Sequence, residues 1–326
     1  MGRWSTRGTA LALVMAAGIG GAQTRRHRPI PRTAAGTPIK NIFWQPNDLK
    51  QGSVAFITVE LERAPLRVTA TWIGKTLSFF KTGNPRIWYA LAGDDVETQP
   101  GSYELVVTAT LPGGRVSHAT KSMDVAPATF TSGTADVPEN YVEPDAAGQK
   151  QVAADDAAKA RAYAHSAEKP LWSGNFIPPV SAKPTESFGE SRILNEEKSS
   201  LHRGTDYPVP ENTPVLAANS GRVVLAKEMF YEGQCVILDH GQKFYTIYMH
   251  LTKTDVNVGE KVEKGKRLGL SGATGRVTGP HVHFGVRWNG AYLDPVELVS
   301  LTLPKMEENT AVKKRAAPAR RSRHRR

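Results

Sequence analysis

Two histidines one residue apart, His281 and His283, lie in the stretch TGPHVHFG, directly after a Gly-Pro break. A β-strand points residues i and i+2 to the same face, so a strand over HVHFGVRW would project both imidazoles to one side. The opposite face would carry a row of apolar, core-facing side chains: Val282, Phe284, Val286 and Trp288. The pattern therefore predicts a ligand or catalytic pair, although a single His-x-His is a weak signal.

A second pair of candidate ligands, His202 and Asp206, lies four residues apart in LHRGTDYPV. Gly204 and Pro208 make a helix improbable there, and an extended segment places both side chains on one face. Two histidines and one aspartate form a three-ligand zinc set that leaves the fourth position open for water. Taken alone, the stretch is better explained by an exposed His202 and an Asp206 that caps a turn. The metal-site hypothesis therefore depends on His283 being close to this pair.

A third candidate, His250, lies in the run YTIYMHLTK. The alternation of side chains predicts a strand with His250 at its end, on the face that also carries Thr246 and Tyr248. A single histidine in such a place is more often structural than catalytic. His250 becomes a candidate functional residue only in combination with the other two pairs.

Three longer stretches contain these residues: HRGTDYPVPENTPVLAANSGRVVLA, CVILDHGQKFYTIYMHL and VNVGEKVEKGKRLGLSGATGRVTGPHVHFGVRWNGAYLDP. In order and spacing they resemble the lysostaphin-type (LytM-like) zinc endopeptidases, over roughly residues 171–300. The departures are small: ENTPV replaces the commoner Gly before Thr-Pro-Val, and Val282 stands where Leu is usual. The resemblance implies that His202, Asp206 and His283 bind one zinc ion per chain, and that His250 and His281 are catalytic residues outside the ligand set.

The resemblance also implies a function. We expect a zinc metalloendopeptidase that hydrolyses peptide cross-links of peptidoglycan through a metal-activated water. Which of His250 and His281 acts as the base stays open, as does the choice between diaminopimelate-type cross-links and glycine bridges. The alternative function is a latent protein, or a non-catalytic wall-binding activator of another cell-wall hydrolase.

The elements that must position these residues are mainly β-strands. Runs rich in β-branched and aromatic residues, VAFITVEL, LRVTATWI, RIWYALAG and SYELVVTATL, predict an N-terminal immunoglobulin-like β-sandwich. The Ala-rich stretch that follows Asp145, a plausible N-cap, predicts a short helix within a linker. The C-terminal part is again rich in strands and glycine turns, and the resemblance implies that it forms an antiparallel β-sheet peptidase domain.

The sequence divides into six segments by composition and by the resemblance. They are a signal peptide (1–22), a basic, Pro-rich linker (23–36), the sandwich (37–126), a linker with a helix (127–170), the LytM-like zinc peptidase domain (171–303) and a basic disordered tail (304–326). The apolar run of the first segment is shorter than the about 20 residues that a membrane-spanning helix needs, which favours a cleaved signal over an anchor. We therefore expect export to the periplasm or cell envelope, with no transmembrane segment after signal removal.

The positive charge of the chain is confined to its ends. The net charge is +11, but residues 305–326 contribute +7, the arginines at 25, 26, 28 and 32 contribute +4, and Arg3 and Arg7 contribute +2, which leaves about −2 for residues 33–304. Such basic arms attract polyanions. In an exported protein we expect anionic envelope polymers as the partner of the tail, and no specific nucleic acid. The single cysteine, Cys235, excludes an intramolecular disulfide and is expected to be buried.

Overall fold

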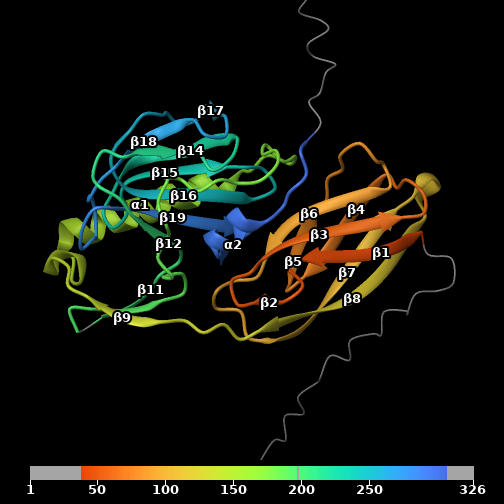
Figure 1. Cartoon of the computed structure of the whole chain (residues 1–326), viewed down its shortest axis with the longest axis horizontal. Helices are drawn as coiled ribbons and strands as arrows, with labels where there is room; N and C mark the ends of the chain where they lie inside the picture. The colour runs from red at the N-terminus through yellow and green to blue at the C-terminus, as the bar shows by residue number, and fades with distance from the viewer. Residues whose placement is uncertain (1–37, 197, 307–326) are drawn as a thin grey trace, which may run out of the picture. The chain divides into compact units, whose positions relative to one another are not determined.

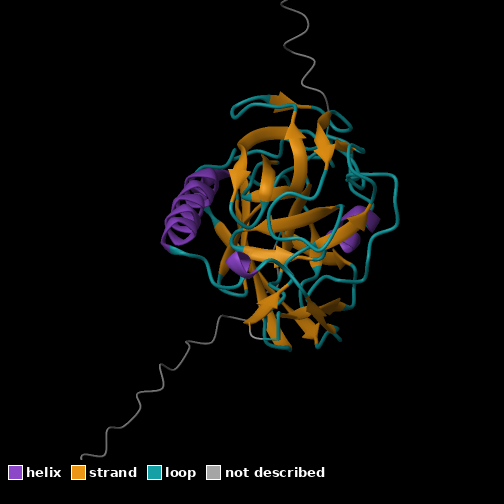
Figure 2. Ribbon diagram, turned by 90° about the vertical axis from the view of Figure 1, so that its left-hand side faces the viewer, coloured by secondary structure: helices purple, strands orange, loops and turns teal. Residues whose placement is uncertain are grey.

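The computed structural model describes residues 38–196 and 198–306, all within one compact unit, Thr33–Arg326 (Figure 1). Strands predominate, as predicted (Figure 2). The predicted signal peptide, the basic linker and nearly all of the basic tail lie outside the described residues and stay predictions. Within the described ranges no helix is long and apolar enough to cross a membrane.

The N-terminal strands form two sheets. One has the order β1-β3-β6, with β1 (Ile39–Gln45), β3 (Val54–Leu61) and β6 (Ile87–Gly93). The other has the order β2-β8-β7-β4-β5, with β2 (Leu49–Lys50), β8 (Val116–Ala126), β7 (Gly101–Thr110), β4 (Arg67–Trp72) and β5 (Lys75–Ser78). Alternate residues of β7 are fully buried and join the same hydrophobic cluster as the buried residues of β3. The four predicted runs are thus strands, and a 3-10 turn, η1 (Pro112–Gly114), separates β7 from β8.

The predicted Ala-rich helix is α1 (Ala146–Ala164), the long purple helix in Figure 2. The Asp145 side chain caps it by accepting a hydrogen bond from the Gly148 amide at 2.8 Å. Because the helix carries few large apolar residues, polar contacts also attach it to the C-terminal sheet. The buried Asp155 accepts hydrogen bonds from Lys227 Nζ at 2.6 Å and from the Phe230 amide at 2.8 Å.

The segment before α1 contains a strand that pairs with the C-terminal part of the chain. Its strand β9 (Ser132–Ala135) pairs in parallel with β10 (Ser191–Leu194), which forms an antiparallel hairpin with β11 (Lys198–Leu201). A 3-10 turn, η2 (Glu139–Tyr141), follows β9. Composition suggested only a linker with a helix here, because a four-residue strand depends on a partner that is distant in sequence.

A nine-stranded sheet forms the C-terminal part. Its main order is β12-β19-β16-β15-β14-β17; β13 pairs with β18, β18 also pairs with β16, and β20 pairs with β19. The bounds are β12 (Thr205–Pro208), β13 (Pro214–Leu216), β14 (Gly221–Met229), β15 (Gly233–Asp239), β16 (Phe244–Thr254), β17 (Lys261–Val262), β18 (Arg267–Ser271), β19 (His281–Trp288) and β20 (Ala291–Leu293). A short helix, α2 (Pro295–Ser300), follows. The pairings within this sheet are antiparallel, as predicted.

The core lies on one face of β19, as the alternation predicts. Val282, Phe284 and Val286 are fully buried in the main hydrophobic cluster, whereas His281 and His283 line a pocket on the other face. Cys235 is also buried, as expected, in a smaller cluster beside α1.

The prediction for His250 was wrong in two respects. Strand β16 continues past it to Thr254, and His250 does not share the face of Tyr248, which is buried in the core; it lines the pocket together with Met249. The cause is a β-bulge. Val236 of β15 pairs with Tyr248, but Gln234 pairs with Leu251, so two residues of β16 oppose one of β15. His250 has the positive φ of 63° that turns its side chain across the sheet.

Candidate metal centre and active site

Strand pairing brings the predicted ligands together. In the antiparallel pair of β12 and β19, Asp206 lies directly opposite His283, and Pro208 lies opposite His281. His202 enters from the short segment that precedes β12. Gly204 makes this path possible, because a Cβ atom there would lie 2.5 Å from His283 Nε2. The Gly in HRGTD therefore lets the chain pass close to the ring of His283.

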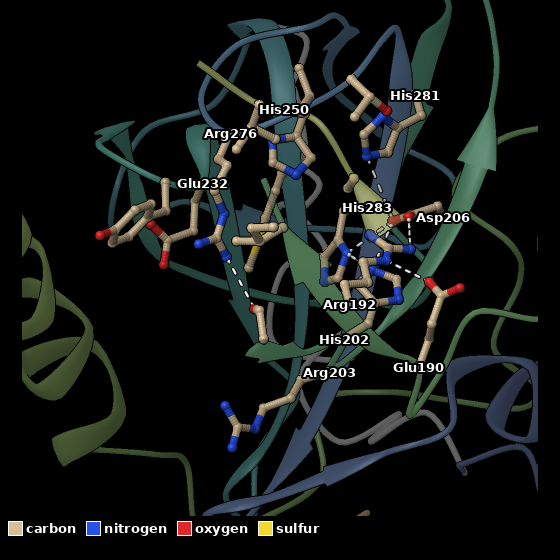
Figure 3. Close-up of a pocket in the computed structure, with 18 of the residues that line it drawn as sticks. Glu190, Arg192, His202, Arg203, Asp206, Glu232, His250, Arg276, His281 and His283 are labelled. Carbon is tan, nitrogen blue, oxygen red and sulfur yellow. Dashed lines mark hydrogen bonds and ion pairs between the residues drawn. The ribbon is translucent and has the colours of Figure 1, made fainter. Parts of the chain in front are cut away.

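Three potential ligand atoms converge at this point (Figure 3). His202 Nε2 lies 3.1 Å from Asp206 Oδ1 and 2.9 Å from His283 Nδ1, and His283 Nδ1 lies 3.1 Å from Asp206 Oδ1. All three residues are buried. Among the described residues, they form the group of His, Cys, Asp and Glu side chains with metal-binding spacing.

The protonation pattern of these residues suits a metal. His202 Nδ1 lies 2.7 Å from the Ser187 carbonyl, which can only accept, so Nδ1 carries the hydrogen and Nε2 presents a lone pair to the centre. Burial by itself raises the pKa of the Asp206 carboxyl, but contacts with His202 and His283 outweigh it and hold that pKa far below its usual value. Burial lowers the pKa of His283, which favours the neutral ring. Two neutral imidazoles and a carboxylate are a suitable donor set for zinc.

The spacing of these atoms also fits a zinc ion. A tetrahedral zinc with ligand bonds near 2.0 Å separates its ligand atoms by about 3.3 Å. The three atoms here are 2.9–3.1 Å apart, so only a small outward adjustment is needed. The lone pair of His202 Nε2 and the charge of Asp206 face each other at close range, an arrangement that a cation between them would stabilise.

A guanidinium holds the second oxygen of Asp206. Arg192, on β10, donates from Nη2 to Asp206 Oδ2 at 2.9 Å and from Nε to Glu190 at 2.5 Å (Figure 3). This leaves Oδ1 directed at the two imidazoles. Arg192 was not predicted as a site residue, since nothing in the stretch ESRILN indicates which distant carboxylate the arginine will meet.

The two remaining predicted residues, His250 and His281, lie beside the ligand triangle. Their ring centroids are 4.8 Å apart, and His281 Nε2 lies 3.6 Å from Asp206 Oδ1. His250 Nδ1 lies 2.9 Å from the Thr274 carbonyl, and His281 Nδ1 lies 2.8 Å from the Gly279 carbonyl. Both Nδ1 atoms therefore carry hydrogen, and in the neutral form of each ring Nε2 is the acceptor. Burial, and then the nearby rings of His281 and His283, lower the pKa of His250 well below its usual value.

All five predicted site residues line one pocket of about 650 Å³. Its walls also contain residues that the sequence analysis did not single out. They come from β9 and the residues after it, from the β10–β11 hairpin and the residue before it, from the β14–β15 turn and from the loop before β19: Thr134, Ala135, Val137, Glu190, Ser200, Tyr231, Glu232 and Arg276. Their separation in sequence, and the absence of any shared motif, explain why composition alone did not reveal them.

Comparison with known proteins agrees with this geometry. Residues 200–295 match the family described as Peptidase family M23. Over 103 residues the chain is 43% identical to the peptidoglycan DD-endopeptidase ShyA of Vibrio cholerae, a match that covers 32% of this chain and 23% of that protein. Over 139 residues it is 36% identical to the DD-carboxypeptidase/endopeptidase Mpg of Neisseria meningitidis, which covers 43% of this chain and 31% of Mpg. The matched part thus spans less than a third of either relative.

A solved structure shares much more of the chain. The crystal structure of a Pseudomonas aeruginosa protein described as a peptidase M23 superposes with a TM-score of 0.57 and 29% identity, and the match covers 77% of this chain and 94% of that one. The shared fold therefore extends well beyond residues 200–295. Together with the family match and the two relatives, it shows that residues 200–295 are similar to the domain of Peptidase family M23.

Proposed function

We propose that this chain is a zinc-dependent endopeptidase that hydrolyses peptide cross-links of peptidoglycan. The observation that carries the proposal is the convergence of His202 Nε2, Asp206 Oδ1 and His283 Nδ1 beside two further imidazoles in one pocket. The names of the relatives, a peptidoglycan DD-endopeptidase and a DD-carboxypeptidase/endopeptidase, support the same class of substrate.

His202, Asp206 and His283 would hold the metal. A zinc ion in that position supplies Lewis acidity, which acidifies water and polarises a peptide carbonyl. The chain contributes the orientation of the ligands. The Ser187 carbonyl fixes the tautomer of His202, and Arg192 fixes the direction of the Asp206 carboxylate. Such outer contacts keep a metal site in its binding geometry.

The proton transfers of peptide hydrolysis fall to His250 and His281 in this proposal. Each ring is anchored through Nδ1 to a backbone carbonyl, so each Nε2 can accept a proton from water. Once protonated, the same atom can donate to the leaving amine or hydrogen-bond to the developing oxyanion. His250 keeps this orientation because its bulged backbone is also held, by a 2.9 Å hydrogen bond from its amide to the Glu232 carbonyl.

The experiment is a digestion of purified sacculi by the full chain. Zinc-loaded and chelator-stripped protein is incubated with sacculi of diaminopimelate-type and glycine-bridged cross-links, and released muropeptides are read by mass spectrometry. We expect zinc-dependent loss of cross-linked dimers, and neither zinc binding nor activity in His283→Ala. His165→Ala, an exposed position after α1, is the matched control.

The outcomes separate the alternatives. Zinc bound at one ion per chain without any cleavage would favour the latent or activator role. Absence of both zinc and cleavage would overturn the site assignment. Cleavage that resists chelation would show that the reaction does not use the proposed ligands.

A further inference from the structure

Arg276 lies in the loop between β18 and β19 and faces the pocket that contains the candidate metal site (Figure 3). Its guanidinium carbon lies 4.7 Å from the centroid of the Tyr231 ring, in cation–π geometry. Its Nη2 donates to Ser200 Oγ at 3.3 Å, and its backbone amide donates to the Tyr231 carbonyl at 2.9 Å. The side chain is half-buried.

The loop that carries Arg276 is held tightly against the β14–β15 turn. Gly275 has φ 76°, and a Cβ atom there would lie 2.4 Å from the Gly233 nitrogen and 2.5 Å from the Tyr231 oxygen. A Cβ atom at Gly233 would likewise lie 2.2 Å from Thr274 Oγ1 and 2.4 Å from the Thr274 carbonyl carbon. The two backbones are therefore in direct contact, so the position of the guanidinium relative to Tyr231 is set by the fold.

The other basic side chains of the pocket are neutralised by carboxylates. Lys159 contacts Glu232 at 2.6 Å and Asp156 at 3.0 Å. Arg192 bridges two carboxylates, and Arg203 contacts Glu97 at 2.7 Å. Arg276, by contrast, has no carboxylate oxygen within 4.0 Å among the described residues, so it makes no ion pair there and feels Glu232 only at longer range.

The position of Arg276 is suited to binding an anionic group of a ligand. Partial burial disfavours a bare guanidinium, and burial accordingly lowers the pKa of Arg276. A guanidinium can bind a carboxylate through two parallel hydrogen bonds, and the interaction is strengthened in a partly desolvated pocket. Glu232, which lines the same pocket, is already engaged by Lys159 and does not fill this place.

We propose that Arg276, stacked on Tyr231 and beside Ser200, is a subsite for a carboxylate of the substrate. This inference rests on the proposed function and narrows it. The pocket selects peptides that present a free carboxylate close to the scissile bond. A diaminopimelate-type cross-link carries such a group on the residue at the link, whereas a glycine bridge has only peptide groups there.

The test compares two soluble muropeptide dimers that differ at one group, the free or the amidated diaminopimelate carboxylate. Steady-state kinetics are measured for the full chain, for Arg276→Gln and for Arg276→Lys. We expect Arg276→Gln to raise KM for the free-carboxylate dimer by about 10- to 100-fold, the range for loss of a charged hydrogen bond, and to leave the amidated dimer unchanged. Arg276→Lys should recover part of the difference.

Arg267→Gln is the matched control, because it removes one positive charge from an exposed arginine that is paired with Asp255 and is not among the pocket-lining residues. Zinc content and melting temperature are measured for every variant to confirm that the fold is intact. Equal losses on both dimers, or no change on either, would overturn the carboxylate subsite.

A calorimetric titration of the two dimers separates this inference from the proposed function. If the zinc-loaded chain cleaves neither dimer, the proposed endopeptidase fails, but the subsite still predicts tighter binding of the free-carboxylate dimer and loss of that preference in Arg276→Gln. Equal affinities for the two dimers would refute the subsite whether or not cleavage occurs.

Discussion

Replacement of Asp94 by Asn should stabilise the protein at alkaline pH and have little effect at acidic pH. Asp94 is fully buried and directly follows β6. Its Oδ1 accepts a hydrogen bond from the Gly52 amide at 2.7 Å, but Oδ2 has no partner among the described residues. Burial, and to a smaller extent the nearby charges of Glu297 and Asp95, raise its pKa from 3.8 to about 7.

The sign of the effect follows from this shift. Below the unfolded-state pKa, Asp94 is protonated in both states, so its contribution to stability is fully present. As the pH rises toward 7 the unfolded chain loses this proton first, and the free energy of unfolding falls until the folded state also ionises. A rise of about three pKa units corresponds to about 4 kcal/mol, which we take as an upper limit. We expect about 2–4 kcal/mol between pH 4 and pH 8.

Urea denaturation of the wild type and of Asp94→Asn across this pH range measures the effect. The difference between the two proteins removes the titration of distant groups and reports Asp94 together with its coupling to Glu297 and Asp95. It should grow in favour of the variant as the pH rises, and become constant above about pH 8. Asp48→Asn, at an exposed position, controls for the loss of a surface charge. A difference that is the same at pH 4 and pH 8 would refute the reasoning, as would a variant that is less stable at every pH.

Three further predictions concern the site. Arg192→Gln should weaken zinc binding by about 10- to 100-fold in a chelator competition, because Asp206 loses the contact that orients it; unchanged affinity would contradict this. His250→Ala should keep its zinc, measured by elemental analysis, and lose about 10²- to 10⁴-fold in kcat; full activity would exclude His250 from proton transfer. Gly275→Ala should lower the free energy of unfolding by about 2–5 kcal/mol, against about 1–2 kcal/mol for Gly259→Ala, which also has positive φ but has no atom within 4 Å of an added Cβ; equal losses would show that close packing is not the cause.

The sequence by itself determined the features that depend on local periodicity and residue type. The run HVHFGVRW alternates strictly, so the strand and the common face of its two histidines could be predicted, and both are confirmed. The Ala-rich stretch after Asp145 has high helix propensity and a good N-cap, and it is a helix with that cap. The meeting of His202, Asp206 and His283 was also predicted, through the resemblance of their spacing to a known family, and the structure brings them together.

Only the tertiary structure decided which distant groups meet. The face of His250 depends on a bulge, and a bulge arises from the register between β15 and β16, which no periodicity within β16 encodes. Arg192 contacts Asp206 because β10 lies beside the site, and β9 becomes part of the pocket wall because it pairs with β10. Asp94 owes its raised pKa mainly to burial, and Arg276 lacks an ion-pair partner among the described residues. Whether a charge is neutralised, or a carboxyl is shielded from water, is set by contacts that only the folded chain creates.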